Sequence, residues 1–206
     1  MNPIRILLVD DHFVVRVGLS YSLQLEPNFQ VVAEAGTGAV VQDLYREHHP
    51  DVVIMDWKLP NENADKIIRR LRAEFREARV IVLSAFETEE IIYQAVQAGA
   101  VGFLPKSAPR PELIQAILTV SRGESAFSHE VAVKVTDRLR RPDLTAREIQ
   151  VIEQLVKGSS NKIIGSELNI SDNTVKLHIT RIMQKLGAKD RTHAASLALQ
   201  RGILDR

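Results

Sequence analysis

Residues 4–11 read IRILLVDD, an apolar run that ends at two neighbouring aspartates, Asp10 and Asp11. Four more short runs of this kind follow, at residues 31–35, 52–55, 80–83 and 101–104. The runs are continuously apolar instead of alternating, which is typical of strands covered on both faces. The sequence therefore predicts five strands buried in the middle of one domain.

Amphipathic stretches separate these runs. They lie at residues 12–25, 39–48, 64–75, 88–98 and 109–122, with Gly99 and Gly123 at suitable helix ends. Five strand–helix pairs in alternation predict an α/β domain in which helices cover both faces of a parallel sheet.

Polar side chains follow the ends of these strands. The first strand leads into Asp10 and Asp11, the third ends at Asp56, the fourth ends at Ser84, and Lys106 follows the fifth. Because the carboxyl ends of parallel strands meet at one edge of a sheet, we expect these five side chains to share that edge.

Three carboxylates at one edge need a compensating cation, because each pair repels by about 4 kcal/mol at an effective dielectric near 20. Oxygen ligands without His or Cys favour a hard cation, and a site with room for phosphate oxygens suits Mg²⁺. Asp56 could then act as a nucleophile that forms an acyl phosphate. In this hypothesis Lys106 supplies positive charge and Ser84 a hydrogen bond.

The second part of the chain differs in charge and pattern. Residues 1–122 contain 13 Lys and Arg against 16 Asp and Glu, whereas residues 123–206 contain 14 against 10. Thr145 and Glu148 form a capping box before a helix that ends at Gly158, a second helix covers about 161–168, and Ser171 is a good N-cap for a third. Two helices joined by a tight turn indicate a helix-turn-helix in a basic domain.

The third helix has two different faces. At 100° per residue, Val175, Ile179, Ile182 and Leu186 form a narrow apolar stripe that suits a core. The opposite side carries Asn173, Lys176, Leu177, Thr180, Arg181 and Gln184. Cations, amides, a hydroxyl and an apolar tip suit phosphate contacts and base reading in the DNA major groove.

The first part resembles the receiver domain of two-component response regulators. The resemblance rests on LLVDDH (7–12), DVVIMDWKLP (51–60), VLSAF (82–86) and AGAVGFLPK (98–106), in this order. It implies a flavodoxin-like fold with a five-stranded parallel sheet. It also implies that the acidic pair and Asp56 hold Mg²⁺, that Asp56 takes a phosphoryl group from a sensor histidine kinase, and that Ser84 and Lys106 bind its oxygens. Phe103 matches the switch aromatic of the family, although it could equally be a core residue.

Residues 144–204 resemble the four-helix LuxR-type domain, and the two parts together are similar to regulators of the NarL/FixJ type. This resemblance implies that the third helix enters the major groove. The resemblance indicates Thr174, Lys176, Leu177 and Thr180 as DNA-binding residues, and the position of Asn173 and Arg181 on the outer face adds these two. Thr180 departs from the family pattern, so a base preference cannot be transferred. The final helix, about 192–201, is rich in small residues and either packs within its own domain or forms a two-fold dimer contact.

Two departures leave alternatives open. Lys58 stands two residues after Asp56, where phosphatases with an aspartyl-phosphate intermediate carry a second Asp as general acid, and this argues against an enzyme. After Pro60 the chain continues Asn61-Glu62-Asn63-Ala64 instead of with glycines, so that loop is stiffer or differently shaped. A regulator that uses its receiver as a phosphorylation-independent dimerisation module therefore remains an alternative.

The sequence as a whole predicts a receiver at 1–122, a linker with a helical part at 123–140 and a helix-turn-helix domain at 141–206. We expect a DNA-binding transcriptional regulator, not an enzyme, that is switched by phosphorylation of Asp56 and pairs as a homodimer when phosphorylated. The chain has no cysteine and no apolar run of about 18 residues, so we expect a cytoplasmic protein without a membrane span.

Overall fold

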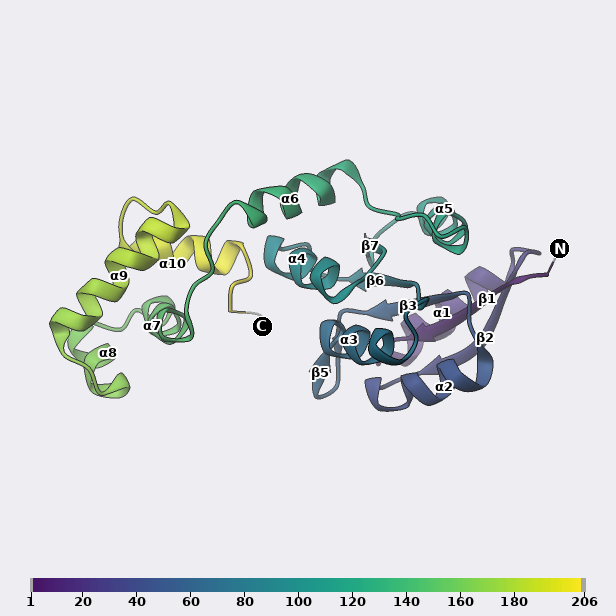
Figure 1. The fold of residues 1–206 in the computed structure, drawn as a ribbon, viewed down its shortest axis with the longest axis horizontal. Helices are drawn as coiled ribbons and strands as arrows, with labels where there is room; N and C mark the ends of the chain where they lie inside the picture. The colour runs from purple at the N-terminus through teal and green to yellow at the C-terminus, as the bar shows by residue number, and fades with distance from the viewer. Residues whose placement is uncertain (1, 205–206) are drawn as a thin grey trace. The chain divides into compact units, whose positions relative to one another are not determined.

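A computed structural model describes residues 2–204 (Figure 1). The chain divides into two compact units, one formed by the residues up to Glu87 together with Ile92–Val133, the other by Thr88–Ile91 together with Lys134 onward. Within residues 2–204, every helix is too short or too polar to cross a membrane.

A five-stranded parallel sheet forms the centre of the first unit. Its strands are β1 (Ile4–Val9), β2 (Phe29–Ala35), β3 (Val52–Asp56), β6 (Val80–Ser84) and β7 (Gly102–Pro105). They lie in the order β2-β1-β3-β6-β7, and every neighbouring pair is parallel. The order reverses at β1, between β2 and β3, so the carboxyl ends of β1 and β3 lie side by side at the point where such sheets bind ligands.

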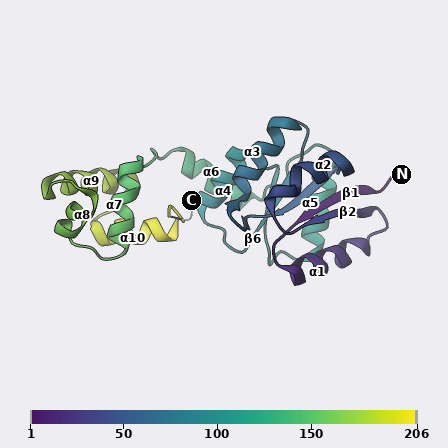
Figure 2. The ribbon, with the colours of Figure 1, turned by 90° about the horizontal axis from the view of Figure 1, so that it is seen from below.

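Helices cover both faces of this sheet. They are α1 (Phe13–Gln24), α2 (Val41–His48), α3 (Ala64–Glu74), α4 (Glu89–Ala98) and α5 (Arg110–Ser121). Leu23 of α1 and Leu113, Ile117 and Val120 of α5 share one core cluster with Ile6 and Ile54 of the sheet. Figure 2 shows α1 and α2 on opposite sides of β1 and β2. The predicted α/β architecture is confirmed.

Two local features were not predicted. A short 3₁₀ helix, η1 (Gly38–Val40), precedes α2. It begins at Gly38, where a Cβ would come within 2.4 Å of the Ile67 side chain of α3. The segment after Asp56 forms a small antiparallel hairpin of β4 (Lys58–Leu59) and β5 (Glu62–Asn63). Asn61 has a φ of 72° at its tip, which asparagine tolerates better than most residues.

The second unit contains a four-helix domain. It is preceded along the chain by α6 (His129–Leu139), and the boundary between Val133 and Lys134 falls within this helix. The four helices are α7 (Ala146–Val156), α8 (Asn161–Leu168), α9 (Asp172–Leu186) and α10 (Arg191–Gln200). Their core includes the predicted stripe Val175, Ile179, Ile182 and Leu186, together with Ile152 of α7.

Local sequence sets the helix boundaries in this domain. Thr145 and Glu148 form the predicted capping box, and Ser171 accepts a hydrogen bond from Thr174 N at the start of α9. The turn between α8 and α9 needs Gly165, because a Cβ there would come within 2.7 Å of the Ile170 carbonyl oxygen. These constraints fix the angle at which α9 leaves α8, and they form the predicted helix-turn-helix.

Candidate functional site

The structure brings Asp10, Asp56 and Lys106 into direct contact at the carboxyl edge of the sheet. Lys106 Nζ lies 2.7 Å from Asp56 Oδ2 and 2.8 Å from Asp10 Oδ2. Asp10 and Asp56 are 2% and 5% exposed, so both carboxylates are removed from water. Lys106 is held in place because its backbone N–H donates to the Ser84 carbonyl, which joins the ends of β6 and β7.

Asp11 completes an acidic cluster with Asp10 and Asp56, and His12 joins it. One ligand atom from each of these four residues lies within 4.8 Å of the others. His12 Nδ1 is 2.8 Å from Asp11 Oδ1, and the His12 backbone N–H donates to Asp10 Oδ1. The sequence analysis missed His12, although its position directly after the acidic pair was a usable signal.

The cluster fits a hard divalent cation. The donor set is dominated by carboxylate oxygens, which Mg²⁺ prefers. Asp10 Oδ2 is buried and lies near Lys106 Nζ, yet it has no hydrogen bond of good geometry. A buried carboxylate oxygen without a directed donor is costly, and a bound cation would satisfy it.

Charge and burial act against each other at Asp56. Burial raises the pKa of the Asp56 carboxyl, and the neighbouring Asp10 adds to the rise, while Lys106 and the Lys58 amide oppose it. Burial alone would lower the pKa of Lys106, but its contacts with Asp10 and Asp56 outweigh burial and raise it. Lys106 therefore stays positively charged beside the Asp56 carboxylate, which is buried away from water.

Ser84 lies at the same edge but is engaged elsewhere. It is 1% exposed, its Oγ donates to the Phe86 carbonyl oxygen at 2.7 Å, and it accepts from the Phe86 N–H at 3.1 Å. The hydroxyl has one hydrogen, so it must give up its bond to the Phe86 carbonyl oxygen before it can donate to a group bound on Asp56.

Phe103 is fully buried, with 1% of its surface exposed. In the receiver family an inward aromatic accompanies a serine that has turned toward the phosphoryl group. In this structure the aromatic ring is already inward while Ser84 is bound to the backbone of Phe86. The inward ring and the backbone-bound serine thus occur together in this structure, and the switch role of Phe103 stays a prediction.

Lys58 is placed beside Asp56 by the β4–β5 hairpin. Its backbone N–H lies 3.4 Å from Asp56 Oδ1, and its side chain is exposed. The hairpin is clamped to α3, because Arg70 donates two hydrogen bonds to the Glu62 carboxylate. The segment that differs from the family pattern thus forms a hairpin that is tied to α3 by an ion pair.

The outer face of α9 is open to a partner. Asn173, Lys176, Leu177, Thr180 and Arg181 are exposed, whereas Thr174 is half-buried and its hydroxyl contacts Ser171. Lys176 Nζ forms an ion pair with Asp172 Oδ2 at 2.7 Å within the helix. Asp172 is a second residue that the sequence analysis missed, and the i, i+4 spacing was the available signal.

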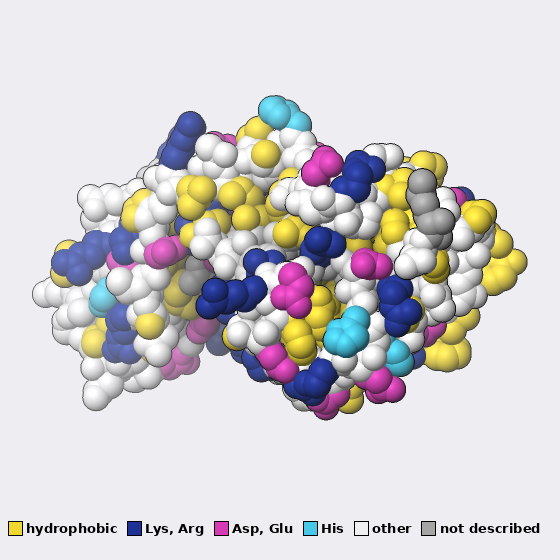
Figure 3. Space-filling view, turned by 45° about the vertical axis from the view of Figure 1, so that its right-hand side comes forward, with side chains coloured by type: hydrophobic (Ala, Val, Ile, Leu, Met, Phe, Trp, Pro, Cys, Tyr) yellow, Lys and Arg dark blue, Asp and Glu magenta, His cyan; other side chains and the backbone are white. Residues whose placement is uncertain are grey.

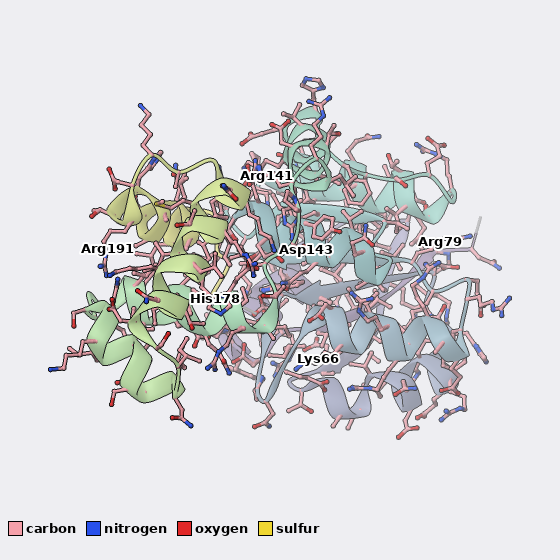
Figure 4. All side chains as sticks on the ribbon, turned by 60° about the vertical axis from the view of Figure 1, so that its left-hand side comes forward. Lys66, Arg79, Arg141, Asp143, His178 and Arg191 are labelled. Carbon is pink, nitrogen blue, oxygen red and sulfur yellow. The ribbon has the colours of Figure 1, made fainter. Side chains whose placement is uncertain are left out.

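The final helix packs mainly on its own domain. Ala194 and Ala198 are completely buried in the core of the second unit. Arg191, at the start of α10, donates to the Asn161 side chain and the Ser159 carbonyl, which ties α10 to the start of α8 (Figure 4). Leu199 stays 57% exposed on the opposite side of the helix.

Charge is mixed on the surface that Figure 3 shows, where Lys and Arg side chains alternate with Asp and Glu. The net charge of the whole chain is only +1. Attraction for a polyanion must therefore come from residues 123–206, which carry 14 Lys and Arg against 10 Asp and Glu, and from cations such as those on α9.

Comparisons with known proteins agree with this geometry. Residues 6–118 match the family described as the response regulator receiver domain, and residues 142–198 match bacterial regulatory proteins of the luxR family.

Relatives match over nearly the whole length. The transcriptional regulatory protein LiaR of Bacillus subtilis is 37% identical over 95% of this chain and 96% of the relative. The probable transcriptional regulatory protein NarL of Mycobacterium tuberculosis is 33% identical over 99% of this chain and 97% of the relative.

Two solved structures are also similar to this chain. The response regulator ChrA of a heme-sensing two-component system is 35% identical, with a TM-score of 0.59 over 98% of this chain and 100% of that one. The RcsB–DNA complex, at 20% identity and a TM-score of 0.71 over 97% of this chain and 99% of that one, shares the fold. The chain belongs to the two-component response regulators that join a receiver domain to a LuxR-type DNA-binding domain.

Proposed function

We propose that Asp56 accepts a phosphoryl group from a sensor histidine kinase and that this event regulates DNA binding by α9. One observation carries the proposal: the Asp56 carboxylate is 5% exposed and lies 2.7 Å from the Lys106 ammonium, beside two further carboxylates. A buried nucleophile with a fixed cation and an acidic cluster for a metal suits phosphoryl transfer better than it suits a purely structural ion pair.

In this mechanism an oxygen of the ionised Asp56 carboxylate attacks phosphorus. The phosphorus–nitrogen bond of the donor phosphohistidine breaks, and its electron pair returns to the imidazole. Asp10, Asp11 and Asp56 would hold Mg²⁺, which supplies positive charge to the phosphoryl oxygens. Lys106 is placed to pair with a phosphoryl oxygen, since it already lies between Asp10 and Asp56.

Ser84 is the first residue that must move after transfer. Its hydroxyl gives up the bond that it donates to the Phe86 carbonyl oxygen in order to donate to a phosphoryl oxygen. The loop after β6 then loses a bond that fixes Phe86, whose side chain is 64% exposed. Phe103, which follows in β7, is proposed to adjust its packing in response.

A kinase needs a docking surface near Asp56, and α1 offers one. This helix starts immediately after the acidic pair and His12, and it leaves Phe13, Val14, Val17 and Tyr21 exposed along one side. An apolar stripe next to a site that must receive a protein-bound phosphohistidine suits a helical partner. We propose that the kinase contacts this stripe during transfer.

In the DNA-binding domain, α9 is the proposed reading helix. Asn173, Thr174, Lys176, Leu177, Thr180 and Arg181 are the proposed contact residues, and the exposure of all but Thr174 supports this role. We further propose that the phosphorylated chain acts as a homodimer in the cytoplasm. Its proposed domains are the receiver at 1–122 and the DNA-binding domain at 141–206, joined by a linker at 123–140.

The experiment is phosphorylation of the full chain by acetyl phosphate and Mg²⁺, read by intact mass. We expect one added phosphoryl group on the unchanged protein and none on Asp56→Asn, with oligomeric state measured on the same samples. Label that persists in Asp56→Asn would contradict the assignment. A protein that takes no label and is dimeric throughout would support the phosphorylation-independent alternative.

A further inference from the structure

Thr180 presents its methyl group, not its hydroxyl, to any partner of α9. Its Oγ1 donates to the Lys176 carbonyl oxygen at 3.0 Å, one turn earlier in the helix. Because the hydroxyl and the methyl share Cβ, this bond turns the hydroxyl toward the backbone and leaves the methyl as the free part of an exposed side chain. A residue that looks polar in the sequence is thus apolar at the surface.

Leu177 lies beside this methyl group. The two residues are three positions apart on α9, so their side chains are neighbours on the helix surface. Leu177 is 49% exposed, whereas the apolar residues Val175, Ile179 and Ile182 of the same helix are buried. Leu177 and the Thr180 methyl therefore form one apolar spot on the outer face, which we call the α9 apolar spot.

Polar and cationic side chains surround this spot. Lys176 and Arg181 are exposed beside it, and Asn173 is exposed one turn before Leu177. Cations suit phosphates and the amide suits base edges, so this surface is complementary to the DNA major groove. The apolar group that a base displays in that groove is the 5-methyl group of thymine.

We propose that the α9 apolar spot reads thymine by contact with its 5-methyl group. The inference rests on the proposed function, in which α9 enters the major groove, and it adds a base preference that the family resemblance does not supply. A thymine methyl that is buried against Leu177 and Thr180 accounts for roughly a fourfold gain in affinity, since burying one methyl group is worth about 0.8 kcal/mol.

The test uses the full chain and DNA duplexes that it selects from a random double-stranded pool. Each thymine of a selected duplex is replaced in turn by deoxyuridine, which lacks only the 5-methyl group. We expect at least one replacement to weaken binding about fourfold. Thr180→Ser keeps the hydroxyl and lacks the methyl, so its preference for the thymine duplex over the deoxyuridine duplex should be clearly smaller.

Thr180→Val is the matched control. It keeps the methyl and has a second methyl in place of the hydroxyl, so its preference for thymine should persist. Leu177→Ala should reduce the preference. Helical circular dichroism and binding of unselected DNA at low salt show whether each variant is folded and still binds DNA.

Two results would overturn the inference: no thymine replacement weakens binding of the unchanged protein, or Thr180→Ser keeps the full preference. Either can occur in a protein that binds DNA well, and the proposed function then stands without this base preference. Failure of the unchanged protein to bind any duplex at low salt would instead contradict the proposed function, and the inference with it.

Discussion

The acidic pocket of the receiver is a buried site, whereas the outer face of α9 is an exposed one. In the pocket, Asp10, Asp56 and Ser84 are almost completely buried. Both aspartates pair with Lys106, and Ser84 bonds to the Phe86 backbone. On α9, the proposed contact residues are mostly exposed. Lys176 pairs with Asp172 and Thr180 donates to the Lys176 carbonyl, so both interactions lie within the helix. A buried site is largely complete before its ligand arrives, whereas an exposed one is completed by the ligand.

This difference has an energetic basis. Charges that leave water must find partners within the protein, because an unpaired buried carboxylate is far more costly than an exposed one. Exposed ion pairs such as Lys176–Asp172 contribute about 0–1 kcal/mol, so they can be exchanged for phosphate contacts at little cost. The pocket should therefore respond strongly to single substitutions, and the α9 face weakly.

The largest effect is expected in the pocket. Asp10→Asn removes a carboxylate that contacts Lys106 and belongs to the acidic cluster. We expect the rate of phosphorylation by acetyl phosphate to fall by about a hundredfold or more, as for loss of one preorganised electrostatic group. The measurement is the initial rate across a range of Mg²⁺ concentrations.

Asp65→Asn is the matched control, because Asp65 lies in the first turn of α3 and is not a member of the acidic cluster. Its rate should equal that of the unchanged protein, and removal of Mg²⁺ by a chelator should stop the reaction in both. An Asp10→Asn rate that stays normal at high Mg²⁺ would show that the cluster is not needed.

A buried charge can also serve only the stability of the fold. Glu148 in the second unit is such a charge, and it lies outside the acidic pocket. Glu148 is 2% exposed and lies 2.7 Å from Lys185 Nζ. Burial raises the pKa of its carboxyl, but Lys185 and Thr145 outweigh burial and lower it from the ordinary value of 4.5. A lowered pKa in the folded state means stability that is present above pH 4.5 and is lost as the pH falls through the folded-state pKa.

We therefore expect Glu148→Gln to lower the free energy of unfolding of the second unit by about 2 kcal/mol at pH 7, with a much smaller loss near pH 3. Urea unfolding followed by helical circular dichroism measures this loss. Trp57, the only tryptophan, lies in the receiver and reports that domain separately by fluorescence, so its transition is the internal control. An equal loss at both pH values would contradict the role of the ionised pair.

On α9, Lys176→Ala should weaken DNA binding by about threefold to tenfold. It should also lower the slope of log affinity against log salt concentration by about one, because one phosphate contact is lost. Lys66→Ala is the control, since Lys66 is an exposed lysine on α3 of the receiver (Figure 4). Filter binding or fluorescence anisotropy at several salt concentrations gives both quantities. Equal affinities for Lys176→Ala and Lys66→Ala would contradict the placement of α9.

The smallest effect concerns Asp172. Its carboxylate holds Lys176 and places a negative charge at the start of the proposed reading helix. Asp172→Asn frees the lysine and removes the repulsion of phosphates, so we expect binding of unselected DNA to tighten by about twofold to fivefold. Unchanged or weaker binding would indicate that the ion pair preorganises Lys176 instead of restraining it.

The same contrast explains what the sequence could predict. Buried strands and their polar ends leave a strong pattern, so the five strands and the meeting of Asp10, Asp56 and Lys106 were predictable. The predicted apolar stripe of α9 was found for the same reason. These features follow from periodicity and from the chain direction of a parallel sheet.

Other details depend on contacts that no pattern encodes. The β4–β5 hairpin depends on Asn61 at positive φ and on the Glu62–Arg70 clamp, and neither was evident from Asn61-Glu62-Asn63-Ala64 alone. The hydroxyl of Ser84 points to the Phe86 backbone because of a local loop geometry. Likewise, only the bond to Lys176 shows that Thr180 offers a methyl group.

The most direct test of the central claim is the DNA affinity of one preparation before and after phosphorylation by acetyl phosphate. For the unchanged protein we predict a shift of roughly 5- to 150-fold, which corresponds to about 1–3 kcal/mol of coupling between Asp56 and α9. Asp56→Asn should show no shift. A fully phosphorylated protein that binds the same DNA with unchanged affinity would contradict the account.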